Sequence, residues 1–147
     1  LHEKYPEKHY VGLDLTPEMI NVAQAKKLSN TEFVVGDSEN LPFPEGSFDA
    51  VICSNSFHHY PNPQAFFNSA YQVLRKGGRL VLRDYTSSDL MVWLMNHLEM
   101  PLANLFGHGD VRIRKPAEFT AMAEKAAFTV LTMEKQKGFR AHLVARK

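Results

Sequence analysis

The chain has 147 residues, of which 44% are hydrophobic and 22% charged, as in one ordinary globular domain whose core needs no metal or disulfide. Its net charge of +1 argues against a nucleic-acid partner, and the short basic run at 112–115 is interpreted as a solvated loop. No signal peptide or membrane-spanning apolar stretch is visible, which predicts no membrane partner. The single cysteine, Cys53, lies in an apolar run, where a small core residue is favoured over a nucleophile, and it fits a reducing, cytoplasmic location.

Short β-type runs alternate with helical stretches, a pattern typical of an α/β domain with a largely parallel sheet. A helix is expected from Pro17 to about Leu28 with Thr16 as its N-cap, and the next is expected to begin at Asn62-Pro63 and to be closed by Lys76-Gly77-Gly78. A later helix begins at Pro116. The expected strands cover residues 9–15, 32–36, 48–53, 79–85, 128–134 and 139–146.

Two features of the C-terminal half stand out. The last two strands are joined by only four residues, Lys135 to Gly138, so they are predicted to form an antiparallel hairpin. The stretch 91–100 holds Trp93 and three methionines, and both an adaptable apolar lid and an ordinary core face stay open for it. We treat 1–147 as a single domain, with 86–115 as a variable region for substrate.

Four of the expected strands end in polar residues: Asp14, Asp37, Ser54-Asn55 and Asp84-Tyr85. Ligands of open α/β sheets bind at the carboxyl ends of the strands. An ionised carboxylate at such an end has two oxygens that accept hydrogen bonds from a ribose diol. A favourable interaction with the dipole of the following helix is the alternative role for Asp14.

Four ordered motifs between Val11 and Asp84 match a known family. They are Val11-Gly12-Leu13-Asp14-Leu15-Thr16-Pro17-Glu18-Met19-Ile20, Gly36-Asp37-Ser38-Glu39-Asn40-Leu41-Pro42-Phe43, Ser47 to Val51 with Phe57-His58-His59, and Leu74 to Leu80. They resemble the second-strand motif, the adenine-binding motif, the fourth-strand motif and the glycine turn before the fifth strand of class I S-adenosylmethionine-dependent methyltransferases. The small-molecule branch that includes the quinone-biosynthesis enzymes is most similar.

The resemblance implies a Rossmann-like, mostly parallel sheet with helices on both faces, and S-adenosyl-L-methionine as cofactor. Asp14 would hold the ribose hydroxyls, with Leu15 and Met19 flanking adenine. Asp37 would accept from the adenine amine, and Ser38 or Glu39 would supply a backbone donor. Ser54 and Asn55 would lie near the methionine part.

One departure from the family is large. The family places a glycine-rich loop after its first strand, so that the backbone approaches the cofactor closely, and this chain contains neither that strand nor that loop. We therefore expect a gap between the strands that end at Asp14 and Ser54, a further N-terminal stretch in the parent gene, and weak cofactor binding by this chain alone. A smaller departure is Ala126-Ala127 before Phe128, where the family usually has Ala-Gly.

Candidates for the acceptor side follow the third and fourth strands. His58 and His59 are candidate catalytic bases because imidazole titrates near neutral pH, and a structural role is the alternative. Tyr60, Asp84 and Tyr85 are candidate substrate contacts. Adjacent histidines point apart in extended chain, so no metal site is predicted.

The favoured function is methyl transfer to a small-molecule acceptor. A nicotinamide-dependent dehydrogenase also uses an acid at the position of Asp14, but the run from Asp37 to Phe43 and the closing hairpin argue against it. A non-catalytic, truncated methyltransferase-like module that acts in binding or assembly is the alternative from another class. A homo-oligomer that completes the sheet also stays open.

Overall fold

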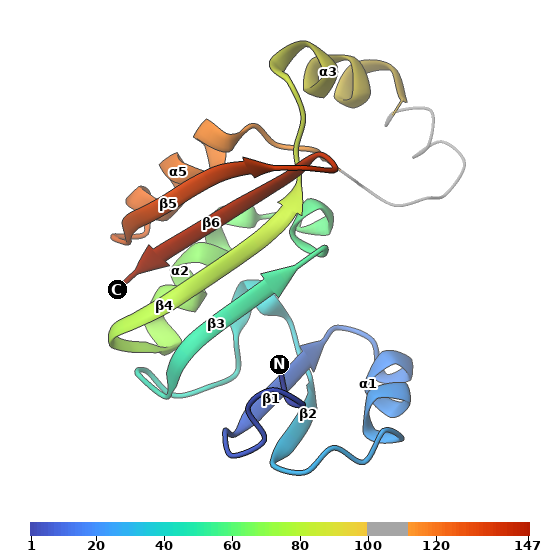
Figure 1. The fold of residues 1–147 in the computed structure, drawn as a ribbon, viewed down its shortest axis with the longest axis vertical. Helices are drawn as coiled ribbons and strands as arrows, with labels where there is room; N and C mark the ends of the chain where they lie inside the picture. The colour runs from blue at the N-terminus through green and yellow to red at the C-terminus, as the bar shows by residue number, and fades with distance from the viewer. Residues whose placement is uncertain (100–111) are drawn as a thin grey trace.

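The computed structural model describes residues 1–99 and 112–147, and their strands form two sheets (Figure 1). In the smaller sheet, β1 (Tyr10–Asp14) pairs parallel with β2 (Thr31–Val35). In the larger sheet the order is β3-β4-β6-β5. There β3 (Phe48–Ser54) pairs parallel with β4 (Leu74–Tyr85), and β6 (Arg140–Arg146) lies antiparallel between β4 and β5 (Thr129–Gln136). The α/β class and the C-terminal antiparallel hairpin are confirmed.

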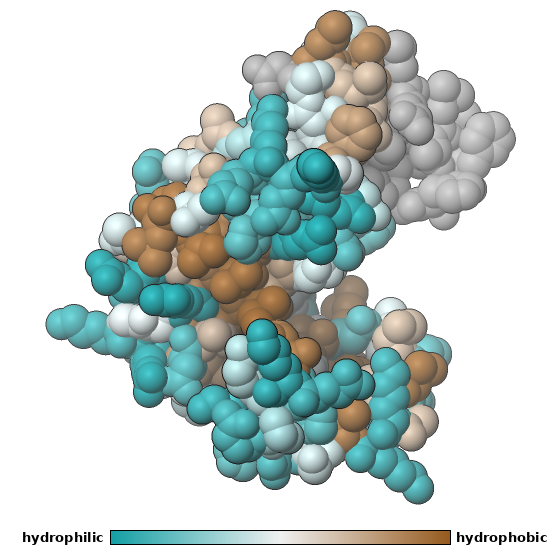
Figure 2. All heavy atoms as spheres, in the orientation of Figure 1, coloured by the Kyte–Doolittle hydropathy of each residue, from teal (hydrophilic) through white to brown (hydrophobic). Residues whose placement is uncertain are grey.

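The expected gap separates the two sheets. Among the described residues β1 pairs only with β2, and β3 pairs only with β4, so the other edge of each strand has no partner strand. Side chains of both strands instead line a common cleft. Ile52 of β3 is 52% exposed although it is a large apolar residue in mid-strand. Figure 2 shows hydrophobic side chains on the surface over the larger sheet and down toward β1.

The first helix begins where expected, at Pro17, but it is shorter than predicted and lacks the expected side-chain cap. Helix α1 (Pro17–Gln24) ends four residues before Leu28, and positive φ angles of 49° at Lys27 and 51° at Asn30 turn the chain into β2. Thr16 stands at the N-cap position but its side chain makes no capping bond. Its hydroxyl donates instead to the Asp14 carboxylate, at 2.9 Å, so the strand end rather than the helix uses this side chain.

Helix α2 (Pro63–Val73) begins as expected, because the side chain of Asn62 accepts from the backbone N–H of Ala65. It ends at Val73, and β4 starts directly at Leu74. The predicted glycine closure of this helix was therefore wrong. Gly77, at φ +80°, turns the chain inside the start of β4 instead.

Five further helical elements of the described residues lie between the strands or beside them. They are α3 (Asp89–Leu94), the π-helical turn η3 (Met95–Glu99), α5 (Pro116–Lys125), and two 3-10 turns, η1 (Ser38–Asn40) and η2 (Phe57–His59). Met91 and Trp93 are 46% and 52% exposed, so in this part of α3 they are not core residues. That the region 86–115 serves the substrate stays a prediction, and its residues 100–111 lie outside the described residues. No helix in the described part of the chain is long and apolar enough to cross a membrane.

The core lies between the larger sheet and helices α2 and α5, which cover one of its faces (Figure 1). Four fully buried phenylalanines fill it together with leucines of β4 and β6: Phe57, Phe66, Phe67, Phe119, Leu80, Leu82 and Leu143. Phe57 contacts the rings of the other three at centroid distances of 5.4–5.6 Å. Turn η2 is thereby anchored in the core at the carboxyl end of β3.

Candidate functional site

A cleft of about 750 Å³ lies between β1 and β3. It collects most of the residues predicted for the cofactor, from the ends of three strands and from η1. The predicted site residues that line it are Asp14, Leu15, Asp37, Ser38, Glu39, Ser54, His59 and Tyr60.

The two strand-end carboxylates are held in the same way. Asp14 Oδ1 accepts from the backbone N–H and the hydroxyl of Thr16, both at 2.9 Å. Asp37 Oδ1 accepts from the backbone N–H of Glu39 at 2.8 Å. In each carboxylate the second oxygen has no protein donor among the described residues. The structure thus places two oriented carboxylates in one cleft, each with an oxygen available to a ligand.

The charge in this cleft has a single sign. Of the described residues that line it, the charged ones are Asp14, Asp37 and Glu39, and no lysine or arginine is among them. Glu39 is partly engaged, because its Oε1 accepts from the backbone N–H of Asn62 at 2.6 Å. The cleft therefore favours a cationic ligand and disfavours one that carries phosphates.

Two predicted cofactor residues lie outside the lining. Met19 is 55% exposed on α1. Asn55 adopts a left-handed conformation with φ 56°, and its backbone N–H donates to the Arg83 carbonyl at 2.9 Å. That N–H is therefore committed to the protein. Contacts of Met19 and Asn55 with the cofactor stay predictions.

A small polar network forms one wall of the cleft. The Cys53 sulfur lies 3.3 Å from the Ser56 hydroxyl and 3.7 Å from the Tyr60 hydroxyl. Burial raises the pKa of the Cys53 thiol and of the Tyr60 hydroxyl. Both groups therefore stay protonated and neutral near neutral pH, and Cys53, at 5% exposure, is a core residue as predicted.

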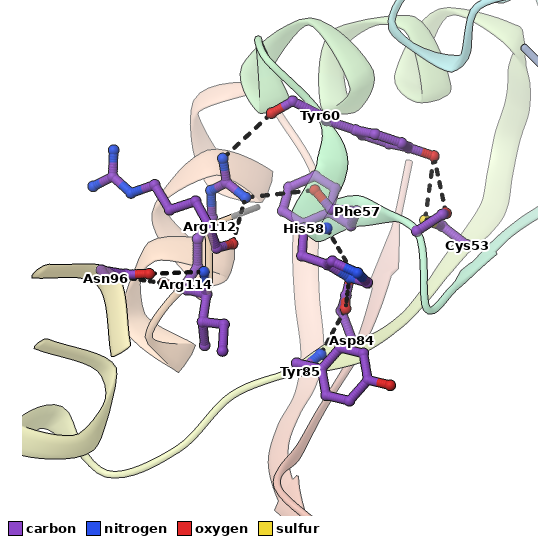
Figure 3. Close-up of polar contacts among 11 residues, drawn as sticks. Cys53, Phe57, His58, Tyr60, Asp84, Tyr85, Asn96, Arg112 and Arg114 are labelled. Carbon is purple, nitrogen blue, oxygen red and sulfur yellow. Dashed lines mark hydrogen bonds and ion pairs between the residues drawn. The ribbon is translucent and has the colours of Figure 1, made fainter. Parts of the chain in front are cut away.

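The most specific arrangement joins η2 to the end of β4 (Figure 3). His58 Nδ1 lies 2.7 Å from Asp84 Oδ1, and the backbone N–H of His58 donates to Asp84 Oδ2 at 2.9 Å. The backbone N–H of Tyr85 also donates to Asp84 Oδ1, at 2.6 Å. Asp84 is 1% exposed, so it faces His58 and does not line the cleft, in contrast to the expected direct contact with substrate.

His59 and Tyr85 flank the His58 ring. The two imidazole centroids lie 4.1 Å apart, and the Tyr85 ring meets His58 edge-on at 5.0 Å. Burial, together with the neighbouring His58, lowers the pKa of His59, which keeps this ring neutral near pH 7. The two adjacent histidines thus have different surroundings. One is paired with a buried carboxylate, and the other lines the cleft.

Arg114 is a residue that sequence reasoning misplaced. It was assigned to a solvated loop but is only 7% exposed, whereas its neighbour Arg112 is exposed. Nothing in the local pattern distinguishes the two arginines, because the guanidinium of Arg114 is held by carbonyls of η2 and its C-cap that lie more than 50 positions away. In the described part of the chain no group of three or more His, Cys, Asp or Glu side chains is placed to hold a metal ion.

Comparison with known proteins assigns the chain to a family. The family described as "Methyltransferase domain" matches residues 1–82. A phthiotriol/phenolphthiotriol dimycocerosates methyltransferase of Mycobacterium leprae is 44% identical over 81 residues, 54% of this chain and 30% of that protein. A fatty-acid O-methyltransferase of Mycolicibacterium smegmatis is 37% identical over 98 residues, 65% of this chain and 36% of that protein.

Among solved structures, an S-adenosylmethionine dependent methyltransferase from Mesorhizobium loti superposes with a TM-score of 0.80 at 15% identity. The match covers 95% of this chain and 80% of that one and shows a common fold. The chain spans about a third of the length of the two curated relatives. Because the family match takes in more than half of its residues, the chain belongs to the methyltransferase domain family.

Proposed function

We propose that this chain is part of an enzyme that transfers a methyl group from S-adenosylmethionine to a small-molecule acceptor. The observation that carries the proposal is the cleft between β1 and β3, in which Asp14 and Asp37 each keep one carboxylate oxygen free of protein donors. Two such acceptors at neighbouring strand ends suit a ribose diol and an exocyclic amine.

The residues present fit that cofactor better than a dinucleotide. S-adenosylmethionine carries a sulfonium cation and no phosphate, and the charged groups of the cleft are acidic. Asp14 would hold the ribose hydroxyls and Asp37 the adenine amine. Since the Glu39 N–H already donates to Asp37, the Ser38 N–H is the better donor for an adenine ring nitrogen.

The cofactor supplies an activated methyl group, so the protein has to position the acceptor, exclude water and take up a proton where the acceptor releases one. His58 is the proposed base. An ionised carboxylate accepts hydrogen bonds but cannot donate them, so pairing with Asp84 places the hydrogen on Nδ1 and leaves Nε2 as the basic nitrogen. Asp84 is then a positioning residue, and His59 and Tyr60 line the cleft itself.

The interrupted sheet belongs to the same proposal. Each of the strands β1 and β3 has one edge that no strand of the described residues pairs with. These edges fit a strand with a glycine-rich loop, which the family resemblance implies and whose glycine motif is not in this sequence. We propose that such a segment completes the cofactor cleft in the working protein. We also propose that this protein acts in the cytoplasm. Until the cleft is completed, a weak cofactor site is expected, because backbone donors for the methionine part are missing.

Calorimetric titration with S-adenosylhomocysteine tests the proposal. We would titrate the 147-residue chain and a second protein in which the first strand and glycine-rich loop of a methyltransferase relative are joined before Leu1. We expect binding by the joined protein, little or none by the shorter chain, and loss of binding in Asp14→Ala. Asp49→Ala is the matched control, because Asp49 is an exposed carboxylate that does not line the cleft.

One alternative function has an observation in its favour. The interrupted sheet also suits a non-catalytic module that acts in binding or assembly, including assembly with a second copy of itself. If both proteins are folded by circular dichroism and neither binds S-adenosylhomocysteine, the enzyme proposal fails and this alternative becomes the better one.

A further inference from the structure

Arg114 donates to three backbone carbonyls around the turn that carries His58 (Figure 3). Its Nη1 donates to the carbonyls of Phe57 at 3.4 Å and of Arg112 at 3.3 Å, and its Nη2 donates to the carbonyl of Tyr60 at 3.5 Å. The guanidinium carbon also lies 5.2 Å from the centroid of the Phe57 ring. One buried, planar cation thus binds both ends of η2.

Arg114 adds a donor to a carbonyl at each end of η2, although the Phe57 carbonyl already accepts from the Tyr60 backbone N–H, at 3.1 Å. The last carbonyls of a short helix have no partner within the helix, and η2 has only three residues, Phe57–His59. A guanidinium reaches two acceptors in a fixed geometry, which a lysine ammonium at the end of a flexible chain does not reproduce. Arg114 therefore restrains η2 through its carbonyls, in addition to the restraint that the Asp84 carboxylate exerts on His58.

The segment that carries Arg114 is itself held at three points. We call residues 112–114 the strap. The backbone N–H of Arg112 donates to the His58 carbonyl at 3.0 Å, and the Thr86 hydroxyl donates to the Arg114 carbonyl at 2.9 Å. Asn96 in η3 binds both backbone groups of Ile113, at 2.7 Å and 3.1 Å.

We propose that Arg114 is a positioning residue that holds the His58 ring against Asp84, and that Asn96, through the strap, links this alignment to the α3–η3 segment. The chain of contacts runs from η3 through the strap to η2 and ends at the His58–Asp84 pair. The role assigned to Arg114 rests on the proposed function only in taking His58 as the base. The restraint on the ring is a property of the protein without any ligand.

The test reads the His58 ring directly. Long-range ¹H–¹⁵N spectra of protein labelled at histidine distinguish an imidazole with its hydrogen on Nδ1 from one with its hydrogen on Nε2, and His58→Asn assigns the signals. Amide exchange at His58, whose N–H donates to Asp84, is measured on the same samples. The variants are Arg114→Gln, Asn96→Ala and the control Arg112→Gln. The Arg112 guanidinium is exposed, and its ion-pair partner among the described residues is Glu118, at 3.8 Å.

In the unchanged protein we expect one tautomer, with the hydrogen on Nδ1. In Arg114→Gln we expect a mixture of tautomers and amide exchange at His58 faster by about tenfold or more, because a charge-assisted restraint is lost. Asn96→Ala should change both readouts in the same direction and by less, and Arg112→Gln should change neither.

A structural role alone predicts something different. If Arg114→Gln lowers the unfolding midpoint while the His58 tautomer and its amide exchange stay as in the unchanged protein, the proposal is overturned. If that variant does not fold, Arg114→Lys takes its place. The proposal is equally overturned if Arg114→Lys leaves the His58 tautomer and its amide exchange as in the unchanged protein. Because no ligand is used, failure of S-adenosylhomocysteine binding would count against the proposed function and leave this result standing.

Discussion

Replacement of Asp84 by asparagine isolates the energetic role of the buried carboxylate. Asp84 accepts three N–H donors, from the His58 ring, the His58 backbone and the Tyr85 backbone. Asparagine keeps the shape but offers only one acceptor oxygen, so its NH₂ group must face at least one of these buried donors. An unsatisfied buried donor costs about 1–3 kcal/mol, and the remaining bonds lose their charge assistance. We expect Asp84→Asn to lower the free energy of unfolding by about 2–4 kcal/mol.

Urea denaturation followed by far-ultraviolet circular dichroism measures this change, with Asp49→Asn as the control. Asp49 pairs with Arg75 at the surface, where the two side chains are 72% and 65% exposed, and loss of such a pair costs about 0–1 kcal/mol. If Asp84→Asn costs no more than Asp49→Asn, the buried carboxylate does not hold η2 to β4, and the reasoning about His58 is refuted.

Two further predictions concern single residues. Ala127, exposed after α5, has a φ of 67° in a turn where the Phe128 N–H donates to the Ala123 carbonyl at 3.0 Å. Because glycine adopts this conformation without a Cβ penalty, Ala127→Gly should raise the free energy of unfolding by about 1 kcal/mol. Ala126→Gly, at a φ of −86°, should lower it. Denaturant titration measures both changes, and changes of the same sign in the two variants would contradict the cap geometry. The folded-state pKa of His59 lies below its ordinary value of 6.5, so protonation favours the unfolded chain and stability falls as the pH drops below about 6.5. His59→Gln should flatten this pH dependence of the unfolding midpoint, and an unchanged slope between pH 5 and about 7.5 would argue against the assigned surroundings of His59.

Much of the fold could be predicted from local sequence. The strand ending at Asp14, the start of α2 at Asn62 and the closing hairpin depend on alternation, capping residues and a short connection, which are contacts between near neighbours in the chain. The gap beside β1 was also predicted, because a missing motif implies a missing strand. Element ends were predicted less well: Thr16 bonds to Asp14 instead of capping α1, and the Gly77 turn lies inside the start of β4.

The candidate site could likewise be predicted in part from local sequence. Asp14 and Asp37 could be placed in one cleft from sequence, because each follows a strand and the carboxyl ends of parallel strands share an edge. The pairing of His58 with Asp84 could not, since the two residues lie 26 positions apart in the chain. The burial of Arg114 could not either, because it depends on carbonyls of Phe57 and Tyr60 that lie more than 50 positions away. Local sequence therefore determined which groups stand at the strand ends, and the tertiary packing of η2, β4 and the strap decided which of them meet.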